Sequence, residues 1–394
     1  MMGIDKETLK NKVVNLLRQY SLSNKSAIAI AIDGEWGVGK SYMYHKIIEE
    51  EIKEVLKITP IYTSVFGKKD ENEIIKDLIS QFLTIENKNV DGIRNLIQGT
   101  FKLFGKNIDM DLLFKFFRKE HMGNTIICID DFERLSDKIP VQDILGLISE
   151  LKENKGCHVI LLYNSSKINT NSQEQFNNYI EKIVDVTYNY TPYPFDQLEL
   201  LKGLLKYPLY TENFPQEEVE KYLSNIKIKN KIDELKLINL REIKKIIYCF
   251  NEYFEGLDNE YLKDEYTRVL FVNIIFYCMV NAKLVIKLED ELSTISQKDT
   301  DSISKIKNEL RLCGMKEDPK NGILNFKPID GNFIRSFVNV IKKYQKNNFF
   351  DFRFSNRYED KSFVKSEEEL ISKLFELAQE YKNNKNKISG EDNE

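Results

Sequence analysis

The sequence predicts an α/β protein in which a central parallel sheet is followed by a mainly helical second half. Two observations predict this: apolar, strand-like runs alternate with amphipathic helical segments up to about residue 190, and the strand-like runs then fade. The 394 residues are 42% hydrophobic and 30% charged, which is the composition of a folded protein of two or three domains. This composition argues against a disordered tail, and the length argues against a single small binding module.

The first half is expected to begin with a helix and then to alternate strands and helices. Apolar residues in 6–20 lie on one helical stripe, which predicts the leading helix. Buried strands are expected at 26–32, 61–66, 125–129, 158–163 and 183–188. Helices are expected between them at 42–56, 71–83 and 141–152. Alternation of this kind indicates a parallel sheet covered by helices on both faces.

The second half is expected to be mainly helical, for example at 195–205 and 217–226. Its apolar stretch 269–282 contains two asparagines and falls short of the roughly 18–20 apolar residues that a membrane helix needs, so it predicts a buried core helix. We expect domain boundaries near Pro192 and near residue 258. The predicted divisions are 1–193, 194–258 and 259–394, with a frayed tail after about residue 383.

Charge and cysteine content narrow the choice of partner and compartment. Lysine and arginine (58) nearly balance aspartate and glutamate (62), for a net charge of −4, so nucleic acid would need a local basic patch such as 227–231. The aromatic and arginine-rich stretch 349–358 could stack on bases, or pack into its own domain. Five unpaired cysteines predict buried thiols. Together with an N-terminus unlike a signal peptide, they predict a cytoplasmic protein without membrane contact.

A glycine-rich segment between the first strand and the next helix matches the phosphate-binding pattern G-x-x-x-x-G-K-[ST]. Its glycines let consecutive backbone amides point at a phosphate, Lys40 would reach the β- and γ-phosphates, and Ser41 would bind Mg²⁺. The alternative is a glycine-rich turn without a ligand. The expected nucleotide-binding residues are Gly34, Glu35, Trp36, Gly37, Val38, Gly39, Lys40 and Ser41.

Acidic residues follow the buried strand 125–129, at the end where parallel sheets bind ligands. Asp130 is the expected second metal ligand, and Asp131 is the first choice for polarising an attacking water, with Glu133 in reserve. Asn164 follows the next strand and is expected beside the γ-phosphate. The alternatives are a solvated acidic loop and an ordinary asparagine that ends a strand.

These motifs together resemble the KAP family of P-loop NTPases. The segment 33–41 is similar to that family's tryptophan-containing Walker A signature, 130–134 resembles its Asp-Asp-Leu-Asp-Arg Walker B run, and 179–184 looks like its closing strand. The resemblance covers roughly 5–250. It implies a central P-loop strand, a further strand between it and the Walker B strand, and a helical lid in 194–258. Two features depart from the pattern: Glu133 stands in place of Asp, and the inserted membrane helices are missing, so a soluble member is expected.

The resemblance also assigns roles to single residues. It puts Asn164 at the sensor position and makes 239–243 the start of a lid helix from which Arg241 contacts the γ-phosphate. Without the resemblance, Arg241 is an exposed helix arginine. Arg134 and Lys182 are candidates for a cation that acts across a subunit interface.

The expected function is that of an ATPase with ATP and Mg²⁺ as ligands, in which hydrolysis drives a switch or assembly subunit. The expected partner is a second copy of the chain or a separate effector. The resemblance implies a place in bacterial anti-phage defence. We expect ATP rather than GTP as the nucleotide. A nucleotide-binding scaffold with little turnover is the alternative, and a small-molecule kinase is a third reading.

Overall fold

The computed structural model describes most of the chain. The described residues are 4–22, 26–86, 114–115, 117–168, 170–225, 238–255, 257, 259–296, 299–313, 315–317, 324–326 and 361–391. The chain divides into two compact units, Met1–Pro192 and Tyr193–Glu394, so this division falls beside the first expected boundary. The basic stretch 227–231 and the aromatic stretch 349–358 lie outside the described residues.

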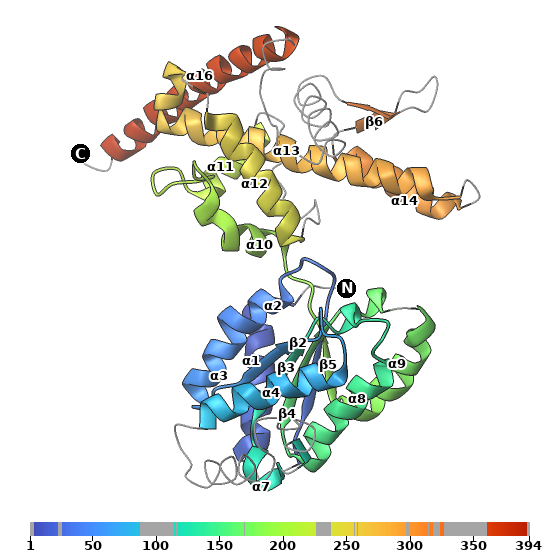
Figure 1. Cartoon of the computed structure of the whole chain (residues 1–394). Coiled ribbons are helices and arrows are strands. Elements are labelled where there is room, and N and C mark those ends of the chain that lie inside the picture. The colour runs from blue at the N-terminus through green and yellow to red at the C-terminus, as the bar shows by residue number, and fades with distance from the viewer. Residues whose placement is uncertain are drawn as a thin grey trace. The chain divides into compact units, whose positions relative to one another are not determined.

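A five-stranded parallel sheet forms the centre of the first unit (Figure 1). Its strands are β1 (Ala29–Asp33), β2 (Ile61–Ser64), β3 (Ile126–Asp130), β4 (His158–Tyr163) and β5 (Val186–Asn189). Their order is β2-β3-β4-β1-β5. The predicted α/β fold with a parallel sheet is therefore confirmed. The expected intervening strand is also found, because β4 lies between β1, which leads into the phosphate loop, and β3, which leads into the acidic residues. The strand β1 is an interior strand but not the central one, a place that β4 takes.

The burial of each strand explains its position in the sheet. All residues of β3 and β4 are buried, as expected for interior parallel strands without a polar face. The edge strand β2 alternates between buried and half-buried residues. The Gln81 side chain covers this edge: its Oε1 accepts from the Tyr62 amide at 3.2 Å, and its Nε2 donates to the Tyr62 carbonyl at 2.6 Å. In the described part of the sheet, the amide thus pairs with the outer side of β2 and fixes the backbone of Tyr62.

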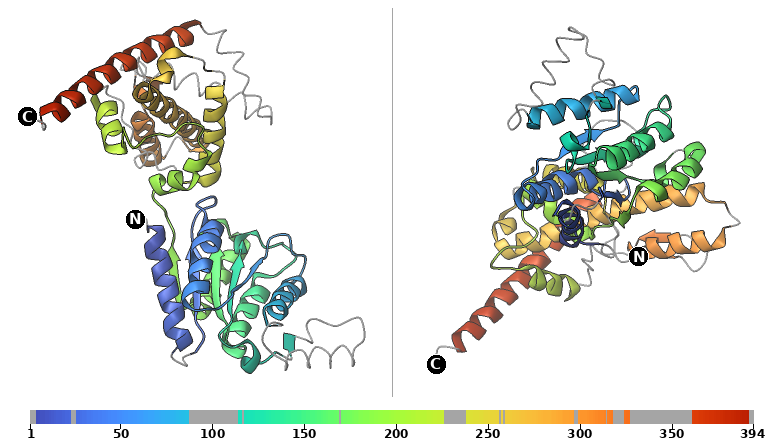
Figure 2. Two further views of the ribbon diagram at one scale, coloured as in Figure 1. Left: turned by 90° about the vertical axis from the view of Figure 1, so that its left-hand side faces the viewer. Right: turned by 90° about the horizontal axis from the view of Figure 1, so that it is seen from below.

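Helices cover both faces of the sheet (Figure 2). They are α1 (Lys6–Leu22), α2 (Lys40–Met43), the π-helical η1 (Tyr44–Ile48), α3 (Glu49–Val55), α4 (Glu71–Glu86), α7 (Lys119–Met122), α8 (Val141–Ser149), the π-helical η3 (Glu150–Asn154) and α9 (Thr170–Ile183). Buried residues of α4, α8 and α9 share one core with alternate residues of β1, β3 and β4. The remaining alternate residues of these strands face α1 and the helical segment 40–55.

One predicted strand segment is wrong. Residues 179–184, expected as part of the closing strand, form the last turn of α9 and the start of the following link, and the strand itself is β5. Phe176 and Ile183 are buried and Ile180 packs against the same core. Their spacing of four and three residues is that of a helix stripe, and this burial outweighs the strand preference of the β-branched residues.

The second unit is mainly helical. Its helices are α10 (Pro194–Leu201), η5 (Lys202–Leu204), α11 (Gln216–Asn225), α12 (Leu240–Glu255), η6 (Glu260–Lys263), α13 (Glu265–Thr294), α14 (Thr300–Leu312) and α16 (Lys361–Glu391), with a short hairpin of β6 (Met315–Glu317) and β7 (Leu324–Phe326). One hydrophobic core joins buried residues from α10 to α16. The expected boundary near residue 258 falls inside this unit. The separate roles expected for its two parts stay predictions.

The central helix of this unit is α13, and it contains the predicted core helix 269–282. An 18-residue window of α13 has a mean hydropathy of 2.1, so by length and composition this helix could cross a membrane, but 89% of the window is buried inside the structure. Asn273 and Asn281 are buried within it and donate to backbone carbonyls. The helix therefore has the packing of a core helix.

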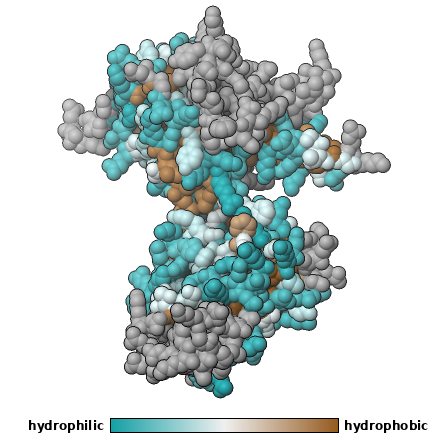
Figure 3. Space-filling view, in the orientation of Figure 1, coloured by the Kyte–Doolittle hydropathy of each residue, from teal (hydrophilic) through white to brown (hydrophobic). Residues whose placement is uncertain are grey.

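Two further features of the second unit are the length of its last helix and a hydrophobic patch on its surface. Helix α16 extends to Glu391, past the residue after which fraying is expected. Its Lys382 pairs with Asp264, the residue that caps α13, which anchors this helix to the core. On the face seen in Figure 3, hydrophobic residues gather over α10. Leu204, in the adjoining η5, is 41% exposed.

Candidate functional site

The phosphate-binding pattern forms the turn between β1 and α2. Gly37 and Gly39 have φ angles of 82° and 91°, in the left-handed region that glycine adopts most readily. A Cβ at Gly34 would lie 2.8 Å from the carbonyl oxygen of Tyr190, so this position also needs glycine. Val38 is buried beneath the loop, whereas Glu35 is exposed. The sequence pattern thus corresponds to a tight, backbone-lined loop followed by a helix.

The charge centre of the site is Lys40. Its Nζ donates to the carbonyl of Gly34 at 2.6 Å and to that of Glu35 at 3.2 Å, and the residue is buried. Burial lowers the pKa of Lys40, while the nearby carboxylates of Asp33, Asp130, Asp131 and Glu133 act in the opposite direction. Four carboxylates therefore surround one buried ammonium, an excess of negative charge that a bound cation would reduce.

Ser41 and Asp130 meet as the predicted metal ligands would. The Ser41 hydroxyl donates to Asp130 Oδ2 at 2.6 Å. The hydroxyl of Tyr62, on β2, donates to the same oxygen at 2.9 Å, and the amide of Asp131 donates to Oδ1 at 2.6 Å. A hydroxyl and a carboxylate are the oxygen ligands that Mg²⁺ prefers, so these residues fit that ion. Burial, with Asp130 beside it, raises the pKa of Tyr62, which keeps its hydroxyl a donor.

Asp131 follows Asp130 in a strained backbone conformation, with φ of 59°. Its Oδ2 accepts from the hydroxyl of Ser64, at the end of β2, at 2.9 Å. Its Oδ1 lies 3.5 Å from Nε of Arg134. The expected water-polarising carboxylate is therefore held at the carboxyl edge of the sheet, beside the expected metal ligand.

Glu133 contacts two other predicted site residues. One carboxylate oxygen accepts from the indole N–H of Trp36, and the other accepts from the backbone N–H of Asn164 at 3.0 Å. Asn164 is buried at the end of β4, and its Oδ1 accepts from the amide and hydroxyl of Ser166. The structure thus brings the phosphate loop, the acidic turn and the end of β4 together.

Arg134 is engaged within its own unit. Its guanidinium lies 5.2 Å from the ring centre of Trp36 and 5.2 Å from that of Phe66, in addition to its pairing with Asp131. Lys182, the other candidate cation, is exposed on α9 and lies 5.8 Å from the ring of Tyr179. Of these two candidate cations, Arg134 lies at the phosphate loop and Lys182 lies on α9.

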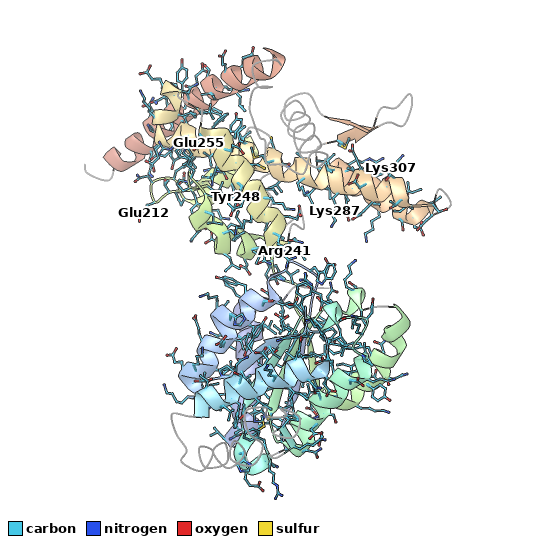
Figure 4. The ribbon with its side chains drawn as sticks, viewed as in Figure 1. Glu212, Arg241, Tyr248, Glu255, Lys287 and Lys307 are labelled. Carbon is cyan, nitrogen blue, oxygen red and sulfur yellow. The ribbon has the colours of Figure 1, made fainter. Side chains whose placement is uncertain are left out.

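Arg241 belongs to the second unit, whereas the phosphate loop belongs to the first. It lies in the first turn of α12 (Figure 4), where Asn239 Oδ1 accepts from its backbone N–H at 3.0 Å. Glu242 beside it pairs with Lys283 of α13 at 3.0 Å, which fixes the start of the helix. The expected contact with the γ-phosphate stays a prediction.

Sequence reasoning missed three polar residues of this site. Tyr62 and Ser64 hold the two aspartates, and Asp33, at the end of β1, accepts from the amide and hydroxyl of Ser165 at 2.9 and 2.6 Å. Asp33 and Ser64 are the last residues of β1 and β2, and Tyr62 lies two residues before the end of β2. The strand order implied by the resemblance, which puts β2 beside β3, was the signal that could have identified the first two.

Comparison with known proteins agrees with the motifs. The model of the KAP family P-loop domain matches residues 7–104 and 106–254. No curated protein matches the chain.

Among solved structures, the chain is similar to Cdc6p from Pyrobaculum aerophilum at 13% identity and a TM-score of 0.41, over 85% of this chain and 94% of that one. The Aeropyrum pernix ORC1 protein in complex with DNA matches at 12% identity and a TM-score of 0.38, over 86% and 94%. A RuvB mutant from Thermotoga maritima matches at 11% identity and a TM-score of 0.33, over 88% and 96%. The family match, and not these distant likenesses, carries the assignment.

Proposed function

The chain belongs to the KAP family of P-loop domains, and on this premise we propose that it hydrolyses ATP with Mg²⁺ as cofactor. The observation that carries the proposal is the meeting of Lys40, Ser41, Asp130 and Asp131 at one edge of the sheet, with the hydroxyl of Ser41 2.6 Å from Asp130. A phosphate loop alone only binds nucleotide. The adjacent pair of aspartates supplies the further groups that hydrolysis needs.

Each residue has a role that follows from its contacts. The loop amides and Lys40 would hold the β- and γ-phosphates of the substrate. Ser41 and Asp130 would hold Mg²⁺, which when bound offsets charge on the phosphate oxygens. Asp131, fixed by Ser64 at 2.9 Å, would orient and polarise the attacking water.

The pairing of Asp131 with Arg134 supports a second candidate function. In this pairing Oδ1 of Asp131 lies 3.5 Å from the guanidinium nitrogen, so the carboxylate is partly engaged before any water arrives. A protein that stayed in this state would bind ATP and turn it over slowly. The second candidate is therefore a nucleotide-binding scaffold that awaits a partner to release Asp131.

We propose that hydrolysis serves a switch or an assembly, with a second copy of the chain or a separate effector as partner. Arg134, Lys182 and Arg241 are the candidates for a cation supplied across such an interface. We also propose a cytoplasmic location, because the five described cysteines are free and buried and thiols stay reduced in the cytoplasm. A role in anti-phage defence rests on the family resemblance, and loss of phage resistance on Lys40→Ala substitution in the native host would support it.

The decisive experiment measures phosphate release and Mg·ATP binding for the wild type, Lys40→Ala and Asp131→Asn over a range of protein concentrations. We expect Lys40→Ala to lose binding, and Asp131→Asn to bind ATP but to lose roughly 10²-fold in turnover. The exposed residues Lys46 and Asp137 supply matched controls, Lys46→Ala and Asp137→Asn, which should behave as wild type. Tight binding without turnover in the wild type would establish the scaffold instead.

A further inference from the structure

Glu133 stands at a junction of three chain segments at the carboxyl edge of the sheet. Its two carboxylate oxygens bond to different partners, the indole N–H of Trp36 and the backbone N–H of Asn164. Trp36 belongs to the phosphate loop, and Asn164 follows β4. Hydrogen bonds to a carboxylate are stronger than neutral ones, so this single side chain restrains both segments.

The restraint acts on a residue at the surface of the protein. The residue is 41% exposed, and its ring is flanked by the guanidinium of Arg134 at 5.2 Å and the ammonium of Lys167 at 5.8 Å. Such cation–π contacts at exposed positions are individually weak. The hydrogen bond to Glu133 joins the tip of the phosphate loop to the acidic turn through a charged acceptor.

We propose that Glu133 is a positioning residue that couples the phosphate loop to the end of β4. This inference rests on the proposed function, and it assigns Glu133 a role other than polarising water. When a γ-phosphate binds at Asn164 and shifts it, the carboxylate of Glu133, which is hydrogen-bonded to both residues, shifts Trp36 as well. The loop then differs between the triphosphate and diphosphate states.

The length of the side chain explains why glutamate stands where the family resemblance expects aspartate. Glu133 reaches outward to two donors on separate segments, and aspartate is shorter by one methylene, about 1.5 Å. Both oxygens already accept a hydrogen bond from the protein. A carboxylate used in this way is poorly available as a general base, whereas Asp131 lies next to the expected metal ligand.

The sequence supplies a direct reporter, because Trp36 is the single tryptophan of the chain. The test compares intrinsic fluorescence and acrylamide quenching in the wild type, Glu133→Gln and Glu133→Asp, first without nucleotide. In Glu133→Gln the amide presents a donor to one of two donors, so one bond is lost. We expect a red-shifted emission and stronger quenching in both variants.

The second arm adds Mg·ADP or a non-hydrolysable Mg·ATP analogue. In the wild type the two ligands should give different emission spectra, and in Glu133→Gln this difference should vanish while the binding affinity stays within about threefold. Turnover should fall roughly tenfold with little change in KM, as for the loss of one charged hydrogen bond. In a double-mutant cycle, Trp36→Phe and Glu133→Gln should then be non-additive in turnover.

Two results would overturn the proposal. One is an unchanged Trp36 spectrum in the nucleotide-free variants, since the contact would then not position the loop. The other is a loss of turnover as large as that of Asp131→Asn, since Glu133 would then act on the water. The fluorescence arms need no hydrolysis, so an inactive wild type would count against the ATPase proposal alone.

Discussion

The two ends of the strands in the central sheet, the amino edge and the carboxyl edge, hold polar groups in different ways. At the amino edge, His158 and Asp185 accept from the backbone amides of Ile28 and Ala29, and Lys152 donates to Asp185 and to a carbonyl. At the carboxyl edge, four carboxylates surround one buried lysine. At the amino edge the charges of Lys152 and Asp185 are paired with each other, whereas the carboxyl edge has a surplus of negative charge.

The difference teaches where stability and function lie in this unit. Buried polar groups that are fully paired with backbone stabilise a fold, and breaking one of their bonds leaves a buried donor or acceptor unsatisfied. A surplus of like charge with a strained residue, Asp131 at φ of 59°, costs stability unless a ligand relieves it. Substitutions at the amino edge should therefore change the free energy of unfolding, and those at the carboxyl edge should change turnover.

The largest expected effect on stability is the pH dependence that His158 contributes. Burial lowers the pKa of His158 from 6.5 to about 4. Between these values the unfolded chain binds more protons than the folded one, so the free energy of unfolding falls as the pH falls. This contribution, about 3 kcal/mol by the linkage relation, is fully present above pH 6.5 and is lost toward pH 4.

The measurement is denaturant unfolding of the wild type and His158→Gln at several pH values from 4 to 8. Glutamine does not titrate, so the free energy of unfolding of the variant should change less between pH 4 and 6.5. The variant should also be less stable than the wild type at pH 8. Parallel curves for the two proteins would show that the histidine is not held neutral. Mg·ATP binding at pH 8 should be equal in both, because His158 lies at the other edge.

A smaller loss of stability is expected at Lys152. Its Nζ donates to the carbonyl of Ile183 and to Asp185 Oδ1, both at 2.9 Å. Lys152→Met keeps the apolar stem and removes the ammonium, which should lower the free energy of unfolding by about 1–3 kcal/mol, since Asp185 is partly exposed. Turnover per folded molecule should not change. The exposed Lys138 provides the control, Lys138→Met, which should leave stability within about 0.5 kcal/mol.

The contrast between the edges also separates what the sequence predicts from what it does not. Strand β4 is predicted at its observed bounds, because five apolar or aromatic residues in a row follow His158 and the turn-forming Asn164 comes next. Ser41 and Asp130 are predicted because each belongs to a local motif. The amino-edge network and Tyr62 are not, since their contacts join residues far apart in the chain. The segment 179–184 is misassigned because β-branched residues also occur at the buried end of a helix.

The smallest expected effect tests the carboxyl edge through Tyr62, which contacts the metal ligand and not the expected substrate. Its hydroxyl donates to Asp130 Oδ2 at 2.9 Å, and its ring stacks on Tyr44 with centres 5.8 Å apart. Tyr62→Phe keeps the stacking and removes the donor. Removing a group that hydrogen-bonds to a metal ligand typically lowers metal affinity or activity 10–100-fold. Because Ser41 also holds Asp130, we expect the lower end of this range, a loss of roughly tenfold in turnover.

The Mg²⁺ concentration that gives half-maximal turnover should rise in Tyr62→Phe, while the free energy of unfolding changes by less than about 1 kcal/mol. This pairing of results separates the two edges, because the amino-edge variants are expected to show the reverse. Tyr44→Phe is the matched control: it removes a buried hydroxyl from the neighbouring ring, which has no hydrogen bond to Asp130. Equal Mg²⁺ dependence in Tyr62→Phe and the wild type would mean that Ser41 and the backbone alone orient Asp130.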